Sequence, residues 1–496
     1  METGDFSNSP PEQSVGQPLE PPVEAPVEQP VAAYQLPRIT LAIMLRLGLF
    51  QLGLGMMSVL LTGLLNRVMI KELGVPATIA SIVLAVTLFV SPLRVWFGHL
   101  SDRKPLWGKL HRTSYVLTGA ICFALLAYLA VQVMWQVGAV SRTVGWGSSA
   151  YGWTIVLAAV FALYGIALSS SSTPFATLLV DVTDEADRAK VVGIGWAMLT
   201  GGIAIGGIAI KVLLQGLETD PSGTTIQASV NNVFVIMPLV VVILAFISTW
   251  GIEQKYSRFM RHRQAVANAN ENITLARSWQ ILTSSRQTRF FFSFLLAMTL
   301  GLFLQDTILE PYGGEVFKMP PGDTAILNSF FGGGALLGIL GAGFWVTPRL
   351  GKRQTAYVGC QLVVLSIVVI IASGFTGNVK FLQLALLLFG LASGVTTTGA
   401  VTLMLDLTAT ETAGMFIGAW GLSQALARGS ATVLGGALLD LSKKLTTDPV
   451  AAYGFVFILQ AVAMLIAIGL LGRVNMQEFQ TKAKEAIAAV MGSDLD

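Results

Sequence analysis

Long apolar runs separated by short polar turns dominate this sequence of 496 residues. Only 12% of the residues are charged and 53% are hydrophobic, whereas a soluble domain carries about 25% charged residues. Because so few charges cannot cover a surface that faces water, lipid must surround much of the chain. This composition excludes a soluble enzyme, a disordered scaffold and a disulfide-built secreted module.

Two further features narrow the functional class. The net charge of +3 is too small to indicate nucleic-acid binding. Cys122 and Cys360 each stand alone within an apolar run, so the sequence offers neither a CxxC redox pair nor a cysteine zinc site.

The spacing of the apolar runs predicts the architecture, since a membrane-spanning helix needs about 20 mostly apolar residues. Runs of this length begin near Leu41, Pro76, Ser114, Trp153, Val191, Val233, Phe290, Thr324, Ala356, Phe381, Gly414 and Tyr453. A polar stretch separates the first six runs from the last six. We therefore expect an all-α integral membrane protein with twelve transmembrane helices in a 6+6 pseudo-symmetric bundle.

Composition divides the chain into five expected segments. They are a disordered, acidic, Pro-rich tail (1–37), an N-terminal six-helix half (38–252), a basic connector (253–289), a C-terminal six-helix half (290–472) and a tail (473–496). The connector and the loops on its side of the membrane hold sixteen Lys and Arg, against eight on the other side. The positive-inside rule then places both termini in the cytoplasm.

The loop after the second predicted helix carries Gly98, Asp102, Arg103 and Gly108. This pattern is similar to a loop signature of the major facilitator superfamily. A transporter would use the loop as a conformational latch, and a structural staple that sets the topology is an equally good interpretation.

An internal repeat supports the division into halves, because Leu179–Thr183 is echoed by Met404–Thr408. Asp181, Arg188 and Asp406 belong to these repeated segments and join the candidate latch. Gly202 and Gly206, like Gly334 and Gly338, stand four residues apart. This spacing lets helix backbones approach closely and predicts packing rather than ligand binding.

The densest group of polar residues ends the seventh predicted helix, where Gln305, Asp306, Glu310 and Glu315 follow an apolar run. Such groups cost free energy within a membrane unless something compensates them. A proton relay, a cation site and an axial ligand for a metal tetrapyrrole are the candidate explanations, and a cap at the helix end is the alternative. Asp306 and Glu310 are four residues apart, so we expect them on one helix face, with Pro311 breaking the helix just beyond.

The same stretch carries a resemblance to a known family. Gln305–Asp306 and Leu309–Phe317 closely resemble a stretch of the PucC/LhaA family. Four other segments are similar to the same family: Arg46–Gln51, Asn66–Gly74, Pro92–Lys104 and Asp181–Arg188. The resemblance covers roughly residues 38–475. Members are major-facilitator-type factors that assist the assembly of light-harvesting complexes and are linked to (bacterio)chlorophyll delivery. Amino-acid usage favours a cyanobacterial member in a thylakoid over one in a purple-bacterial membrane.

The resemblance implies a membrane assembly factor without enzymatic activity. It would bind (bacterio)chlorophyll transiently, or bind newly made light-harvesting subunits, in a photosynthetic membrane. Magnesium in chlorophyll prefers oxygen and nitrogen donors, so Asp306 and Glu310 are candidate magnesium ligands. The full set of pigment-binding or proton-coupling candidates is Gln305, Asp306, Glu310, Glu315, Gln361, Gln424 and Arg428. The expected macrocycle lining is Phe290, Phe291, Phe292, Phe294, Met298, Phe303, Phe330 and Phe331.

Two other functions stay open on the sequence. A proton-coupled secondary transporter of a small or amphiphilic solute would use Asp306, Glu310 or Arg428 for coupling. A structural scaffold with a vestigial transporter fold would need none of them.

Overall fold

Helices make up nearly all of the chain that the computed structural model describes, namely residues 39–108, 110–183, 185–215, 223–257, 286–406 and 413–474. All of these residues belong to one compact unit, Ile39–Asp496. The described residues contain no β-strand. The predicted tail at 1–37, most of the predicted connector and the C-terminal tail beyond Val474 lie outside the described residues.

The helices of the first half run from Leu41 to Tyr256. They are α1 (Leu41–Ser58) with its π-helical continuations η1 (Val59–Leu65) and η2 (Val68–Glu72), α2 (Ala77–Phe89), η3 (Ser91–Leu93), α3 (Arg94–Arg103), α4 (Arg112–Thr143), α5 (Ser148–Val182), α6 (Glu185–Leu214), α7 (Gly223–Thr249) and α8 (Ile252–Tyr256).

The helices of the second half run from Arg286 to Arg473. They are α10 (Arg286–Phe303), α11 (Leu309–Glu315), α12 (Pro321–Gly341) with η5 (Ala342–Val346) and α13 (Thr347–Leu350), α14 (Lys352–Thr376), α15 (Val379–Asp406), α16 (Ala413–Leu445) and α17 (Pro449–Arg473).

The lengths of these helices suit a membrane. Nine helical stretches among the described residues are long and apolar enough to cross one, and two shorter apolar helices are Ala77–Leu93 and Arg289–Phe303. Those two and α16 fall where the remaining predicted spans begin. The all-helical, multi-pass architecture is confirmed, while the number of crossings and the side that the termini face stay predictions.

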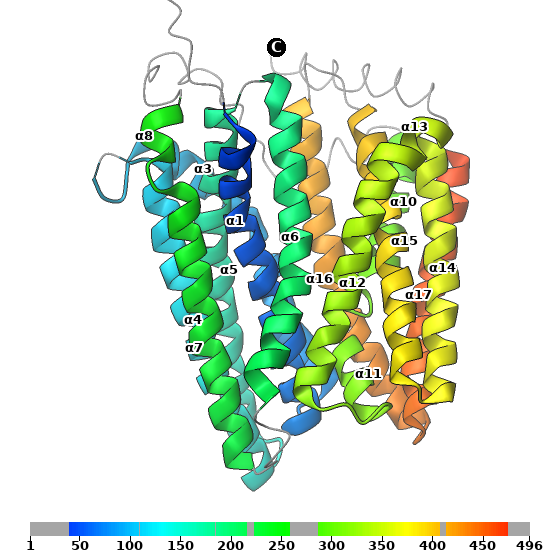
Figure 1. Cartoon of the computed structure of the whole chain (residues 1–496). Coiled ribbons are helices and arrows are strands. Elements are labelled where there is room, and N and C mark those ends of the chain that lie inside the picture. The colour runs from blue at the N-terminus through cyan, green and yellow to red at the C-terminus, as the bar shows by residue number, and fades with distance from the viewer. Residues whose placement is uncertain are drawn as a thin grey trace, which may run out of the picture. The chain divides into compact units, whose positions relative to one another are not determined.

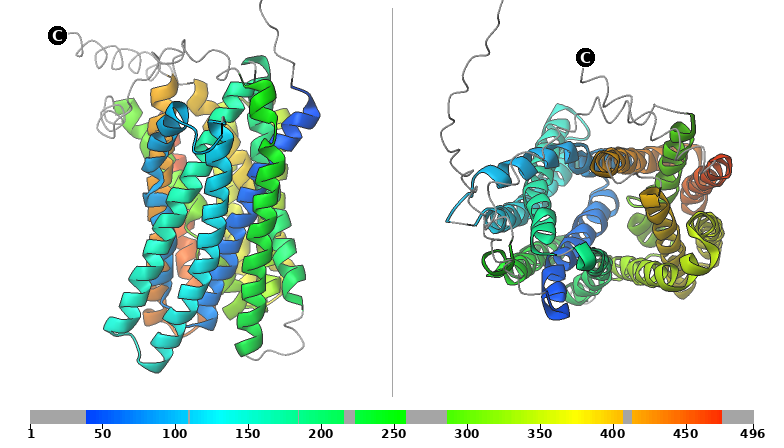
Figure 2. Two further views of the ribbon diagram at one scale, coloured as in Figure 1. Left: turned by 90° about the vertical axis from the view of Figure 1, so that its left-hand side faces the viewer. Right: turned by 90° about the horizontal axis from the view of Figure 1, so that it is seen from above.

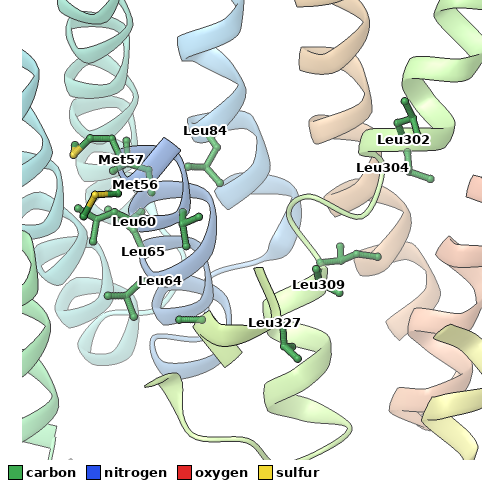
Figure 3. Close-up of a cluster of buried hydrophobic side chains, with 14 of the residues drawn as sticks. Met56, Met57, Leu60, Leu64, Leu65, Leu84, Leu302, Leu304, Leu309 and Leu327 are labelled. Carbon is green, nitrogen blue, oxygen red and sulfur yellow. The ribbon is translucent and has the colours of Figure 1, made fainter. Parts of the chain in front are cut away.

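The two halves lie side by side (Figures 1 and 2), with α1, α2 and α6 at the boundary on one side and α12 and α16 on the other. Contact between the halves runs mainly through α6 with α12 and α2 with α16. Buried leucines of both halves fill the boundary near η1 and α11 (Figure 3).

Glycines allow the closest helix contacts. A Cβ at Gly202 would meet the backbone of Leu52, so α6 lies directly against α1. In the second half, Cβ atoms at Gly334 and Gly338 would meet the backbones of Leu387 and Leu391, which brings α12 against α15. The packing interpretation of these glycines is therefore confirmed.

Candidate functional site

The seventh span is interrupted at the polar group singled out in the sequence. It consists of α10 and α11, and the turn Leu304–Ile308 lies between them. The expectation that Asp306 and Glu310 share one helix face is wrong, because Asp306 lies in the turn and Glu310 lies on α11.

Proline explains why the interruption precedes Glu310. Pro311 has no N–H to donate to the carbonyl four residues earlier, and its ring crowds that carbonyl. The carbonyl belongs to Thr307, and it instead accepts a hydrogen bond of 2.6 Å from Asn66 Nδ2. Pro311 therefore interrupts the helix one turn before its own position, and the freed carbonyl of Thr307 becomes the acceptor for Asn66 of the first span.

Glu310 lies at the boundary between the halves. Its side chain is 3% exposed, and Oε1 accepts a hydrogen bond from Asn328 Nδ2 on α12. A Cβ at Gly63 would collide with this carboxylate, so the missing side chain there makes room for it. Oε2 has no hydrogen-bond partner among the described residues.

Arg67 joins the halves beside Glu310. Its side chain is 2% exposed, and its guanidinium donates to Thr324 Oγ1 and to the Met319 carbonyl, both at 2.9 Å. Glu72 Oε1 lies 3.4 Å from the same group. Sequence reasoning missed Asn66 and Arg67 as site residues, although two adjacent polar residues in an apolar run were the available signal.

Further polar contacts between the halves lie at the same end of the bundle, the lower end in Figure 1. The Asp440 carboxylate accepts from Ala77 N at 3.0 Å and Thr78 N at 2.7 Å and so caps α2. Lys211 pairs with Asp323 at 2.8 Å. We call this set, with the contacts of Asn66, Arg67 and Glu310, the seal.

A cavity of about 600 Å³ lies between the halves above the seal. Its wall comes from α1, η1, α2, α3, α5, α6, α16 and the turn of the seventh span. Asp306 from that turn pairs with Arg428 of α16 at 3.0 Å, and the Arg428 guanidinium stacks 4.3 Å from the centre of the Phe303 ring. Arg94 also lines this cavity.

Aromatic and hydroxyl side chains of the first half shape the cavity. Phe161, Tyr164 and Trp196 line it, and Trp196 is 52% exposed. A smaller cavity of about 260 Å³ shares Gln51, Ala176 and Trp196 with it. None of the eight residues of the expected macrocycle lining in the second half lines either of these two cavities, and that expectation stays a prediction.

The other predicted site residues separate into different surroundings. Gln305 is buried, and its side-chain oxygen accepts from Gln460 Nε2 at 2.5 Å. Glu315 pairs with Lys443 at 2.8 Å. Gln424 accepts from Thr299 Oγ1 at 3.1 Å, and Gln361 is exposed on α14. Asp306 and Arg428 alone among the seven candidates line the large cavity.

The latch candidates are described in part. Asp181 pairs with Arg112 at 3.1 Å, and Arg112 Nη1 donates to Ser101 Oγ at 2.7 Å. Gly108 has a φ of +65°, which favours glycine in that turn. Gly98, Asp102 and Arg103 lie on α3, Arg188 lies on α6 and Asp406 ends α15, and the surroundings of these five residues lie outside the description.

A buried acid completes this end of the first half. Glu253 on α8 is 1% exposed and accepts from the backbone N–H groups of His111 at 2.7 Å, Arg112 at 3.0 Å and Thr113 at 2.7 Å. It therefore satisfies the N-terminus of α4 from another helix. In the sequence Glu253 begins the predicted basic connector, and no local pattern there indicates this capping role.

Comparison with known proteins identifies the family. Residues 64–479 match the family model described as PUCC protein. The chain belongs to the PucC family. Protein PucC of Cereibacter sphaeroides is 30% identical over 457 residues, which are 89% of this chain and 94% of that protein. A Rhodobacter capsulatus protein named bacteriochlorophyll synthase 44.5 kDa chain is 29% identical over 429 residues, which are 85% and 92% of the two chains.

Solved structures place this PucC-family chain in the major-facilitator fold. The nucleoside transporter NupG superposes with a TM-score of 0.62 at 14% identity, over 87% of this chain and 99% of that one. A bacterial homologue of the iron transporter ferroportin, in an inward-facing state, gives a TM-score of 0.62 at 14% identity, over 88% and 99%. These likenesses support an integral multi-pass membrane protein and do not identify a substrate.

Proposed function

We propose that this PucC-family chain is an assembly factor of the photosynthetic membrane. It binds chlorophyll-type pigment or newly made light-harvesting subunits and assists pigment delivery to them, without catalysing a reaction. The observation that carries the proposal is the family match over residues 64–479. A relative of nearly the same length bears a bacteriochlorophyll-related name, which supports pigment as the cargo.

The large cavity is the proposed pigment site. Its volume of about 600 Å³ lies within the range of small-molecule sites. Trp196 offers an exposed aromatic surface on which a flat macrocycle can stack. Of the two candidate magnesium ligands, Asp306 lines this cavity and Glu310 lies in the seal. We therefore assign the pigment-side role to Asp306 and a conformational role to Glu310.

The proposed topology has twelve spans with both termini in the cytoplasm. The seal then lies on the non-cytoplasmic side, because α1 begins and α17 ends at the opposite end of the bundle (Figure 1). The cavity lies between the seal and the cytoplasm, which supports loading from that side.

Purification from the native membrane in mild detergent tests the cargo. Absorption spectra and mass spectrometry of the co-purifying species are the measurements. Stoichiometric chlorophyll-type pigment or an antenna subunit is the expected result. A colourless monomer that binds a soluble metabolite contradicts the proposal.

Variants test the two acids. We expect Asp306→Ala and Glu310→Ala each to lower antenna accumulation while the protein itself persists, because the first leaves Arg428 unpaired and the second removes the partner of Asn328. Gln361→Ala is the control, since Gln361 is exposed outside both cavities. Normal antenna levels in both acid variants would remove these acids from the mechanism.

A proton-coupled secondary transporter is the second candidate function. The transporter-like fold and the Asp306–Arg428 pair beside a cavity favour it. Uptake of a radiolabelled solute into proteoliposomes under an imposed proton gradient would support it, and uptake that ignores the gradient would count against coupling.

A further inference from the structure

Arg94 occupies a break in the second span. The helix α2 ends at Phe89, η3 follows, and Arg94 is the first residue of α3. Pro92 within η3 lacks the N–H that a continuous helix needs, which accounts for the break. The Arg94 side chain lines the large cavity from there.

The charges that line this cavity do not balance. They are Arg94, Asp306 and Arg428. Asp306 and Arg428 form an ion pair at 3.0 Å and so compensate each other. Arg94 makes no ion pair or hydrogen bond within the part of the chain that the structure describes. Among the described residues, the lining of the cavity therefore carries one uncompensated positive charge.

Arg94 is exposed, so its guanidinium is accessible from the cavity, and a charge without a counter-ion is unfavourable against a largely apolar wall. Guanidinium groups match carboxylates especially well, because their planar fork donates two parallel hydrogen bonds. We infer that Arg94 is the recognition residue for a carboxylate on an amphiphilic cavity ligand. The inference rests on the proposed function. If the cargo is a magnesium tetrapyrrole, Arg94 favours the pigment with a free propionate over the ester of that propionate.

The rest of the cavity agrees with such a ligand. Apolar side chains such as Leu54, Leu84 and Leu168 form much of its wall and suit a hydrophobic macrocycle. Ser172 lines the cavity too, and its buried hydroxyl has no hydrogen-bond partner among the described residues.

A binding comparison between acid and ester tests the inference. The full-length chain in phosphatidylcholine nanodiscs is titrated with chlorophyllide a and with its methyl ester, and binding is followed by pigment absorption and fluorescence. We expect the acid to bind about 10- to 100-fold more tightly than the ester, the range for a hydrogen-bonded charged group. This arm needs no variant, so it holds even if a substitution at Arg94 impairs folding.

Variants then assign the preference to Arg94. We expect Arg94→Gln to bring the affinity for the acid down to that for the ester. Arg94→Lys should retain part of the preference because it keeps the charge and loses the fork. Arg349→Gln is the control, since Arg349 is an exposed arginine on α13 outside both cavities, and it should leave the preference intact.

The outcomes separate this inference from the proposed function. Equal affinities for acid and ester overturn the role of Arg94 and leave pigment binding in place. Absence of binding by either probe overturns pigment binding and the inference together. Displacement of the acid by phosphatidylglycerol, in wild type and not in Arg94→Gln, would assign Arg94 to a lipid phosphate and overturn the carboxylate assignment.

Discussion

At the scale of single residues, buried polar groups find partners that are distant in the sequence. The carbonyl of Thr307 accepts its hydrogen bond from Asn66, and Glu253 accepts from the first residues of α4. A buried polar group that loses such a partner costs about 1–3 kcal/mol. These contacts therefore fix how neighbouring helices meet.

The role of Glu253 leads to a stability prediction. We expect Glu253→Ala to lower the free energy of unfolding by about 1–3 kcal/mol, because three backbone N–H groups at the start of α4 lose their acceptor. Thermal unfolding of the purified protein measures the effect as a lower Tm. Gln254→Ala, an exposed neighbour on α8, is the control. An equal Tm for the two variants would contradict the capping role.

Sequence reasoning located the polar residues of the seventh span and could not locate their partners. Charged and amide groups in an apolar run are visible in the sequence, which is why Asp306 and Glu310 were found. Their partners Arg428 and Asn328 lie 122 and 18 residues away. No local pattern encodes such a pairing, so the separation of Asp306 from Glu310 required the fold.

At the scale of helices, close backbone contact between α1 and α6 depends on one glycine. A Cβ at Gly202 would meet the backbone of Leu52, whereas a Cβ at the adjacent Gly201 would meet nothing within 4 Å. These neighbours therefore form a matched pair in which helix propensity is the same and only the packing differs.

We expect Gly202→Ala to push α6 away from α1, and to lower both the Tm and the yield of folded protein. Gly201→Ala should be neutral or stabilising by up to about 1 kcal/mol, since alanine favours helix over glycine. Thermal unfolding and size-exclusion chromatography of both variants are the measurements. Similar behaviour of the two would show that the contact at Gly202 tolerates a methyl group.

The helices themselves followed from apolar periodicity and length, but their interruptions did not. The predicted starts near Leu41 and Pro76 agree with α1 and α2 to within a residue. The helix α4 begins two residues and α5 five residues earlier than predicted, because polar residues such as Arg112 and Ser148 extend them beyond the apolar run. In the seventh span the break expected at Pro311 is wrong, because α11 continues through Pro311 and the interruption falls on the preceding turn, Leu304–Ile308.

At the scale of the whole bundle, the seal joins the two halves through helix ends. Asp440 of α16 caps α2 of the other half, whereas Asp448 caps its own helix, α17, by accepting from Val450 N and Ala451 N. Each aspartate accepts hydrogen bonds at the N-terminus of a helix, but only Asp440 does so across the boundary between the halves.

We expect Asp440→Ala to speed amide hydrogen exchange at Ala77 and Thr78, and also in the adjoining part of α12, because the seal opens more often. Asp448→Ala should speed exchange only at Val450 and Ala451. Hydrogen-exchange mass spectrometry on peptides from these regions is the measurement. Exchange confined to Ala77 and Thr78 in the first variant would mean that Asp440 caps α2 without holding the halves together.

The polar character of the seal limits how the halves can separate. Parting them would strip Arg67, Asp440 and the Thr307 carbonyl of their partners within one movement. Hydrocarbon offers no replacement for these bonds, so water must flow into the gap as it widens. Water therefore enters this end of the bundle while the halves separate, and the seal stays closed as long as water is kept out.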